Sequence, residues 1–221
     1  GLLQIIFPEL VALQGVETQD GKGHKDNFYH TLQVLDNIAT KTDDLWLRWA
    51  AILHDIAKPP TKRFDAEVGW TFHGHEVVGS RVTKKALEDL KFSRETINEV
   101  VKLVRWHMFF SDTEQITLSA VRRMIANVGR ENIWDLMDVR ICDRIGTGRP
   151  KEDPYRLRKY HAMIEEALRA PTTVGMLKIH GGILMKELNI KPGPRMGFIL
   201  HALLEECLEN DEKNNLEYLK S

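Results

Sequence analysis

LRWAAILHDIAKP, residues Leu47–Pro59, places His54 and Asp55 next to each other near the C-terminal end of an apolar segment. Apolar side chains recur there at helical spacing and predict a mostly buried helix; they are Leu45, Trp46, Trp49, Ile52, Leu53 and Ile56. A buried carboxylate is costly unless it is paired or bound to a metal. Lys58 follows one turn later, and two consecutive prolines after it are expected to stop the helix. We therefore expect a functional site at this helix end.

A metal site needs three or more ligands, and an isolated His-Asp pair is common on protein surfaces. Four further residues combine metal-ligand chemistry with a position near the end of a predicted helix: His30, His75, His107 and Asp143. Imidazole nitrogens and carboxylates suit divalent first-row metals or Mg²⁺. One ion would take four of these ligands, namely His30, His54, Asp55 and Asp143. A second ion would take His75 and His107 and share Asp55. Alternatively, His30 is an ordinary solvent-facing residue at a helix start.

Composition sets broad limits on the protein. The chain has 221 residues, 43% of them hydrophobic, which suits one large domain or one domain with a smaller appendage. The net charge of −1 does not by itself predict nucleic-acid binding. Cys142 and Cys207 are too few and too far apart for a disulfide framework, which fits a cytoplasmic location. We expect no membrane segment and no signal peptide. Because residue 1 is Gly, we expect sequence to be missing upstream.

Helical periodicity recurs along most of the chain, so the expected fold class is all-α. Besides the central helix, we expect short helical pieces in residues 1–13 and helices at 28–39, 73–90, 94–107, 118–128, 131–145 and 156–168, with a helical hairpin at 180–206. Asn27 and Ser93 are the expected N-caps of the helices that follow them. Residues 15–25 are expected to form a loop. Residues 61–72, with Phe64, Trp70 and Phe72, are expected to form a flap with some strand character.

Residues 140–159 are locally basic, with seven basic and three acidic side chains, and Tyr155 and Tyr160 lie among them. Such a segment can hold a phosphate backbone, or it can be a solvated linker with ordinary helix charges. The Lys-Pro-Gly-Pro turn at 191–194 can bind an anion or simply join two helices. The candidate RNA- or phosphate-binding residues are Arg144, Arg149, Lys151, Arg156, Arg158, Lys191 and Arg195.

The ordered pattern of His30, His54-Asp55, HGHEVVG, RWHM and CDRIG resembles the HD-domain metal-dependent phosphohydrolases, which are all-α domains acting mostly on phosphate esters. Longer stretches resemble the C-terminal half of bacterial tRNA nucleotidyltransferases (CCA-adding enzymes) and related poly(A) polymerases; they are GHKDNFYHTLQVLDNIA, WAAILHDIAKP, TFHGHEVVGS, GTGRPKEDPYRLRK and KPGPRMGFILHALLEE. Ala57 stands where the family usually has Gly. The Gly-rich start and aspartate pair of the nucleotidyltransferase domain are missing, so this chain alone is not expected to add nucleotides to tRNA.

The resemblance implies a lead-in at residues 1–26, an HD metal-binding domain at 27–160 and a smaller helical, RNA-contacting arm at 161–221. It implies a metal-dependent phosphohydrolase, a phosphodiesterase or phosphatase, that acts on nucleotide or RNA-end phosphate esters. One or two divalent ions (Mg, Mn, Fe, Co or Ni) would serve as cofactors. Asp55 and Lys58 are the expected catalytic residues, Lys58 because its charge can orient a phosphate oxygen.

Two other functions stay open. The chain could be a tRNA-binding body and tail without hydrolysis of its own, working with an upstream or separate nucleotidyltransferase domain. It could also be a di-iron oxygenase, because a shared six-ligand set fixes geometry but not the reaction. The basic, Gly- and Pro-rich C-terminal half favours nucleic acid over the oxygenase.

Overall fold

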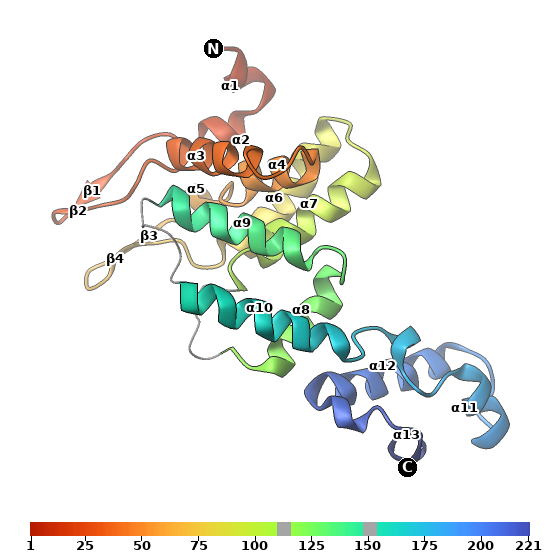
Figure 1. Ribbon diagram of the computed structural model, residues 1–221. Coiled ribbons are helices and arrows are strands. Elements are labelled where there is room, and N and C mark those ends of the chain that lie inside the picture. The colour runs from red at the N-terminus through yellow and green to blue at the C-terminus, as the bar shows by residue number, and fades with distance from the viewer. Residues whose placement is uncertain (110–115, 148–153) are drawn as a thin grey trace. The chain divides into compact units, whose positions relative to one another are not determined.

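The computed structural model describes residues 1–109, 116–147 and 154–221. Helices make up most of this part of the chain, with two short hairpins beside them (Figure 1). The all-α fold class is therefore confirmed. The chain divides into two compact units. The first unit consists of Gly1–Ser111 and Trp134–Pro154, and the second consists of Asp112–Ile133 and Tyr155–Ser221. Within the described residues, no helix is both long enough and apolar enough to cross a membrane.

The first unit is a bundle in which α4 packs against both α3 and α7, and α6 packs against α7. Its helices are α1 (Leu2–Ile6), α2 (Pro8–Val11), α3 (Asn27–Ala39), α4 (Leu45–Leu53), α5 (Lys58–Thr61), α6 (His75–Asp89), α7 (Arg94–Trp106) and nearly all of α9 (Ile133–Gly146). Its fully buried apolar side chains include Val34, Ile38, Leu53, Val100 and Val104. This bundle positions the candidate site.

Side-chain caps start three of these helices. Ser93 accepts the Thr96 N–H at the start of α7, as predicted. The predicted cap of α3 was wrong by one residue, because Asp26 accepts two backbone N–H groups there, whereas Asn27 is the first helical residue. Asp44 caps α4 in the same way. A carboxylate at these positions also interacts favourably with the helix dipole.

The central helix ends earlier than predicted. Helix α4 stops at Leu53, the chain turns through residues 54–57, and α5 begins at Lys58. Pro59 does not stop a helix; it is the second residue of α5, where a missing N–H removes no helical hydrogen bond. The predicted buried face was also partly wrong, since Leu45 is 64% exposed. His54 and Asp55 therefore lie in a turn between two helices.

Two antiparallel hairpins accompany the bundle. Strands β3 (Arg63–Asp65) and β4 (Gly69–Thr71) pair Phe64 with Trp70, which confirms the strand character of the flap. Strands β1 (Thr18–Gln19) and β2 (Lys22–Gly23) form where a loop was predicted. Asp20 and Gly21 between them both have positive φ, 52° and 73°. An Asp-Gly pair with positive φ is typical of a two-residue hairpin turn.

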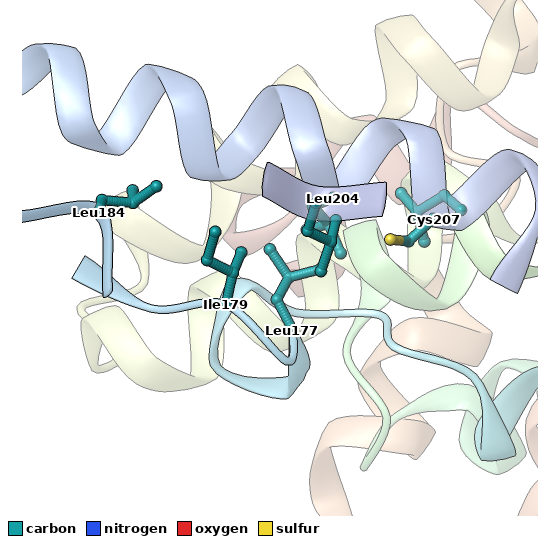
Figure 2. Packing of buried hydrophobic residues seen from close by; sticks show 7 residues of the cluster. Leu177, Ile179, Leu184, Leu204 and Cys207 are labelled. Atoms are coloured by element: carbon teal, nitrogen blue, oxygen red, sulfur yellow. The ribbon is translucent and has the colours of Figure 1, made fainter. Parts of the chain in front are cut away.

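The second unit contains α8 (Leu118–Val128), nearly all of α10 (Pro154–Arg169), the 3-10 turn η2 (Val174–Met176), α11 (Gly181–Glu187), α12 (Pro194–Glu209), the 3-10 turn η3 (Asp211–Lys213) and α13 (Leu216–Lys220). Its core includes Leu177, Ile179, Leu184, Leu204 and Cys207 (Figure 2). Helix α8 packs against α12 and so belongs to this unit. The boundaries of the two compact units thus differ from those of the expected domains, 27–160 and 161–221. Those domain bounds stay a prediction.

Candidate metal centre

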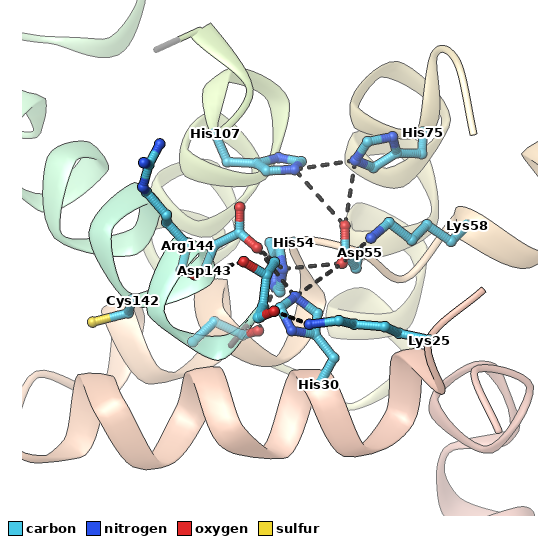
Figure 3. Close-up of polar contacts among 12 residues, drawn as sticks. Lys25, His30, His54, Asp55, Lys58, His75, His107, Cys142, Asp143 and Arg144 are labelled. Atoms are coloured by element: carbon cyan, nitrogen blue, oxygen red, sulfur yellow. Dashed lines mark hydrogen bonds and ion pairs between the residues drawn. The ribbon is translucent and has the colours of Figure 1, made fainter. Parts of the chain in front are cut away.

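Six metal-capable side chains from five places in the first unit meet at one point (Figure 3). His30 lies in the first turn of α3, and His75 is the first residue of α6. His107 follows α7 directly, and Asp143 lies in the last turn of α9. His54 and Asp55 lie in the turn after α4. All except the half-buried Asp143 are buried, so the solvent-facing alternative for His30 is wrong.

The first group of ligand atoms contains His30, His54, Asp55 and Asp143, whose atoms all lie within 4.8 Å of one another. His30 Nε2 is 3.1 Å from Asp143 Oδ1 and 3.5 Å from Asp55 Oδ2. His54 Nε2 is 3.2 Å from Asp55 Oδ2, yet it makes no hydrogen bond within the described residues. A buried ring nitrogen that has no hydrogen-bond partner but lies close to a carboxylate oxygen fits a ligand of a cation.

The second group contains Asp55, His75 and His107. Asp55 Oδ1 is 3.3 Å from His75 Nε2 and 4.0 Å from His107 Nε2. Asp55 therefore turns one carboxylate oxygen to each group. This is the arrangement that a bridging carboxylate between two ions requires.

Backbone contacts fix the orientation of three of the four histidines. The Nδ1 atoms of His54, His75 and His107 lie 2.7–2.8 Å from the carbonyl oxygens of Ala51, Phe72 and Val104. A carbonyl only accepts hydrogen bonds, so each Nδ1 carries a proton and each Nε2 faces the cluster. The Nε2 atoms of His75 and His107 are 3.2 Å apart. Two lone pairs at this distance repel unless a cation lies between them, so the residues fit a divalent metal.

The sequence comparisons agree with this geometry. Residues 27–147, more than half of the chain, match the HD domain. The chain belongs to the HD-domain family. It is 34% identical to the A-adding tRNA nucleotidyltransferase of Deinococcus radiodurans, over 93% of its own length and 48% of the relative. It is also 34% identical to the CC-adding tRNA nucleotidyltransferase of Thermus thermophilus, over 95% of its length and 47% of the relative.

A more distant relative is the multifunctional CCA protein of Neisseria gonorrhoeae, 28% identical over 76% of this chain and 41% of the relative. The HD-domain chain therefore spans about half the length, or less, of these curated relatives. Its resemblance to the HD-domain and tRNA nucleotidyltransferase families is confirmed.

Electrostatics in the HD site favour a cation. Burial would lower the pKa of His54, but the carboxylates of Asp55 and Asp143 outweigh it and raise this pKa to about 10. Burial would raise the pKa of the Asp55 carboxyl, but the charges of His54 and Lys58 hold it well below its usual range. Burial, and then the charge on His54, lower the pKa of His107 to about 3. Without a metal, the site thus combines ionised carboxylates, a protonated His54 and a neutral His107.

Metal binding should release a proton. Because the pKa of His54 is raised to about 10, its imidazole is protonated at neutral pH in the metal-free HD site. A metal ligand must be deprotonated. We expect the first ion to displace about one proton, so that its affinity rises by up to about tenfold per pH unit between about pH 6 and 8. Calorimetry of Mn²⁺ binding in buffers of different ionisation enthalpy measures this number; an affinity that does not change with pH contradicts it.

Several residues around the HD site were not identified from the sequence. Arg140 Nη1 lies 3.2 Å from Asp143 Oδ2. Lys25 donates from Nζ to the carbonyl of Thr147, just after α9. The two contacts hold the end of α9 and its carboxylate in place. Arg140 and Asp143 are three residues apart on one helix, a spacing that brings side chains together and was available in the sequence.

Gly146 brings α9 close to His30. A Cβ atom on Gly146 would lie 2.8 Å from Val34 Cγ2 and 3.2 Å from His30 Nδ1. We expect Gly146→Ala to lower the unfolding free energy by about 1–3 kcal/mol, as overpacking does. Metal affinity should fall about 10–100-fold, as for residues that orient a ligand. Urea unfolding and Mn²⁺ titration measure the two effects. Gly197→Ala is the control, because a Cβ there meets nothing within 4 Å; equal behaviour of the two variants contradicts this role.

The candidate RNA-binding residues are divided between the two compact units. Arg144 lies half-buried in the first unit, whereas Arg158, Lys191 and Arg195 are exposed in the second and Arg156 there is half-buried. Arg149 and Lys151 lie outside the described residues. Tyr160 is 1% exposed and packs in the core, so it cannot stack on a base, whereas Tyr155 is 67% exposed. RNA binding by these residues stays a prediction.

Proposed function

We propose that this chain is a metal-dependent phosphohydrolase, a phosphodiesterase or phosphatase, acting on nucleotide or RNA-end phosphate esters. The observation that carries the proposal is the position of Asp55, which turns one oxygen to each of two histidine-containing groups. A cleft of about 600 Å³ lies beside it and is lined by Asp55, Lys58, His75 and Asp143. The cleft is large enough for a phosphate ester.

Each group of ligand atoms could hold one ion. The first ion would be held by His30, His54, Asp55 and Asp143, and the second would be held by His75, His107 and Asp55. When bound, such ions polarise a phosphoryl oxygen and lower the pKa of water. Lys58 Nζ lies 2.6 Å from Asp55 Oδ2 and has further protons to donate, so it orients a phosphate oxygen at the edge of the site. Water adds to phosphorus, and the bond from phosphorus to the leaving oxygen breaks.

The direct test is to remove the metal and to assay hydrolysis of 2′,3′-cyclic AMP with Mg²⁺, Mn²⁺, Co²⁺ or Ni²⁺ added back. The proposal predicts turnover that depends on the added ion and is lost in His54→Ala. Absence of turnover with every ion, in protein shown to be folded and loaded, counts against hydrolysis.

A second function is supported by the extent of the similarity. Relatives named tRNA nucleotidyltransferases match 93–95% of the chain, so their likeness includes the second unit as well as the HD domain. We therefore propose that the chain also binds tRNA and works with a nucleotidyltransferase domain. Exposed cations at Arg158, Lys191 and Arg195 support this. Filter binding of tRNA should weaken steeply with salt, and no binding at low salt would contradict it.

A further inference from the structure

Two chemically different sets of side chains line the cleft beside the metal centre. Asp55, Lys58, Glu76 and Asp143 provide charge, whereas Trp70, Phe72 and Met108 provide a mainly apolar wall. All of these residues belong to the first unit. Inorganic phosphate would use only the charged part. A ligand that fills the cleft must therefore join a phosphate to an apolar group.

Lys58 links the two parts of the cleft. Its Nζ atom lies 2.6 Å from Asp55 Oδ2 and 5.6 Å from the centre of the Phe72 ring. A phosphate oxygen that accepts a hydrogen bond from Lys58 therefore brings its ester group close to Phe72. The polar Thr71 and His73 flank Phe72 along the flap and also line the cleft. A planar ring can stack on an aromatic face, and polar groups at the edge of such a ring could meet Thr71 and His73.

The wall is held in place by the first hairpin. Lys22 donates from Nζ to two carbonyls of the β3–β4 turn, at 2.7 and 2.6 Å, and its own carbonyl accepts the Trp70 Nε1–H. Lys62 Nζ lies 4.3 Å from the Trp70 ring centre. The ring of His24 meets Trp70 and Phe72 edge-on, at 5.7 and 5.9 Å between centres. Because protein groups alone make these contacts, little ordering cost remains when a ligand binds.

We propose that Phe72 is the base-stacking residue of this site: the base of a nucleotide substrate packs on the Phe72 ring while its phosphate reaches Lys58. The inference rests on the proposed phosphohydrolase function and names the residue that would hold the base. Trp70 is engaged by Lys62 and by the Lys22 carbonyl, and so supports the wall. Stacking is tolerant of base identity, so purine and pyrimidine nucleotides should both bind.

The test compares two substrates that carry the same five-membered cyclic phosphate, 2′,3′-cyclic AMP and glycerol 1,2-cyclic phosphate. Only the first has a base. In the metal-loaded protein, Phe72→Leu should lower kcat/KM for the nucleotide about tenfold more than for the glycerol ester, the size of effect that loss of base stacking gives. Phe72→Tyr keeps an aromatic ring and should keep the wild-type preference for the nucleotide over the glycerol ester. Phe64→Leu is the matched control, because Phe64 packs on Trp70 in the same flap but does not line the cleft; it should affect both substrates alike.

Binding provides a readout that does not need turnover. Calorimetry should show that Phe72→Leu weakens adenosine 2′-monophosphate about tenfold relative to inorganic phosphate. If the wild type hydrolyses neither substrate, the proposed hydrolase function is contradicted. The titration still tests whether Phe72 stacks on the base. Equal losses for both substrates, or an unchanged preference for the nucleotide over inorganic phosphate, overturn the base-stacking role. Failure of adenosine 2′-monophosphate to bind the wild type also overturns it.

Discussion

Asp55→Ala should abolish both metal retention and hydrolysis. The carboxylate faces His30 and His54 with one oxygen and His75 and His107 with the other, so its loss disrupts both ligand groups. Residues that only orient a ligand cost about 10–100-fold in metal affinity or activity when they are changed. Loss of a shared ligand should therefore lower kcat/KM for 2′,3′-cyclic AMP by more than about 100-fold. Plasma mass spectrometry of the purified variant measures the metal bound per chain.

Asp36→Ala is the matched control for this variant, because Asp36 is an exposed aspartate on α3. It should keep both the metal and the activity of the wild type. Far-UV circular dichroism should show the same helical content for both variants. An Asp55→Ala protein that keeps its metal and its turnover contradicts the assignment of the shared ligand.

Lys58→Met should separate metal binding from phosphate orientation. Lys58 carries no ligand lone pair when it is protonated, so the variant should still bind metal. A hydrogen bond to a charged group contributes about 1.5–3 kcal/mol, so kcat/KM should fall by about 10–100-fold. Steady-state kinetics with 2′,3′-cyclic AMP, together with the metal content, provide the measurement.

The control for Lys58→Met is Lys84→Met, at a side chain that is 61% exposed on α6. It should leave both kinetics and metal content unchanged. If Lys58→Met loses its metal, then Lys58 acts by positioning Asp55. If its kinetics equal those of the wild type, Lys58 does not contact the phosphate.

The metal-capable residues of the candidate site could be selected from the sequence because each one lies near the end of a predicted helix, and their role as ligands stays a prediction. The residues that pack around these side chains could not be predicted in the same way. For α3, apolar spacing pointed to Phe28, Leu32, Leu35 and Ile38, yet Leu32 is 37% exposed. The buried stripe consists of Asn27, His30, Thr31, Val34 and Ile38. One of its polar members, His30, faces the candidate metal centre, and hydrophobic periodicity detects only the apolar core.

Other features depend on the exact ends of helices or on contacts between distant segments. The carbonyls that orient His75 and His107 belong to Phe72 and Val104, each three residues earlier, and both contacts follow from where the helices begin and end. The contact of Gly146 with His30 joins α9 to α3 across the bundle. No local pattern in the sequence predicts such a contact. The β1–β2 hairpin is different, because its Asp-Gly pair is a recognised turn pattern that predicts it.

Anomalous diffraction from crystals soaked in Mn²⁺ tests the central claim most directly. The HD site predicts an anomalous peak between Asp55 Oδ2 and the Nε2 atoms of His30 and His54, with a second at His75 and His107 if two ions bind. Crystals of Asp55→Ala should lack these peaks. Anomalous signal only at other positions, with His75 and His107 still facing each other across an unfilled site, would contradict the account.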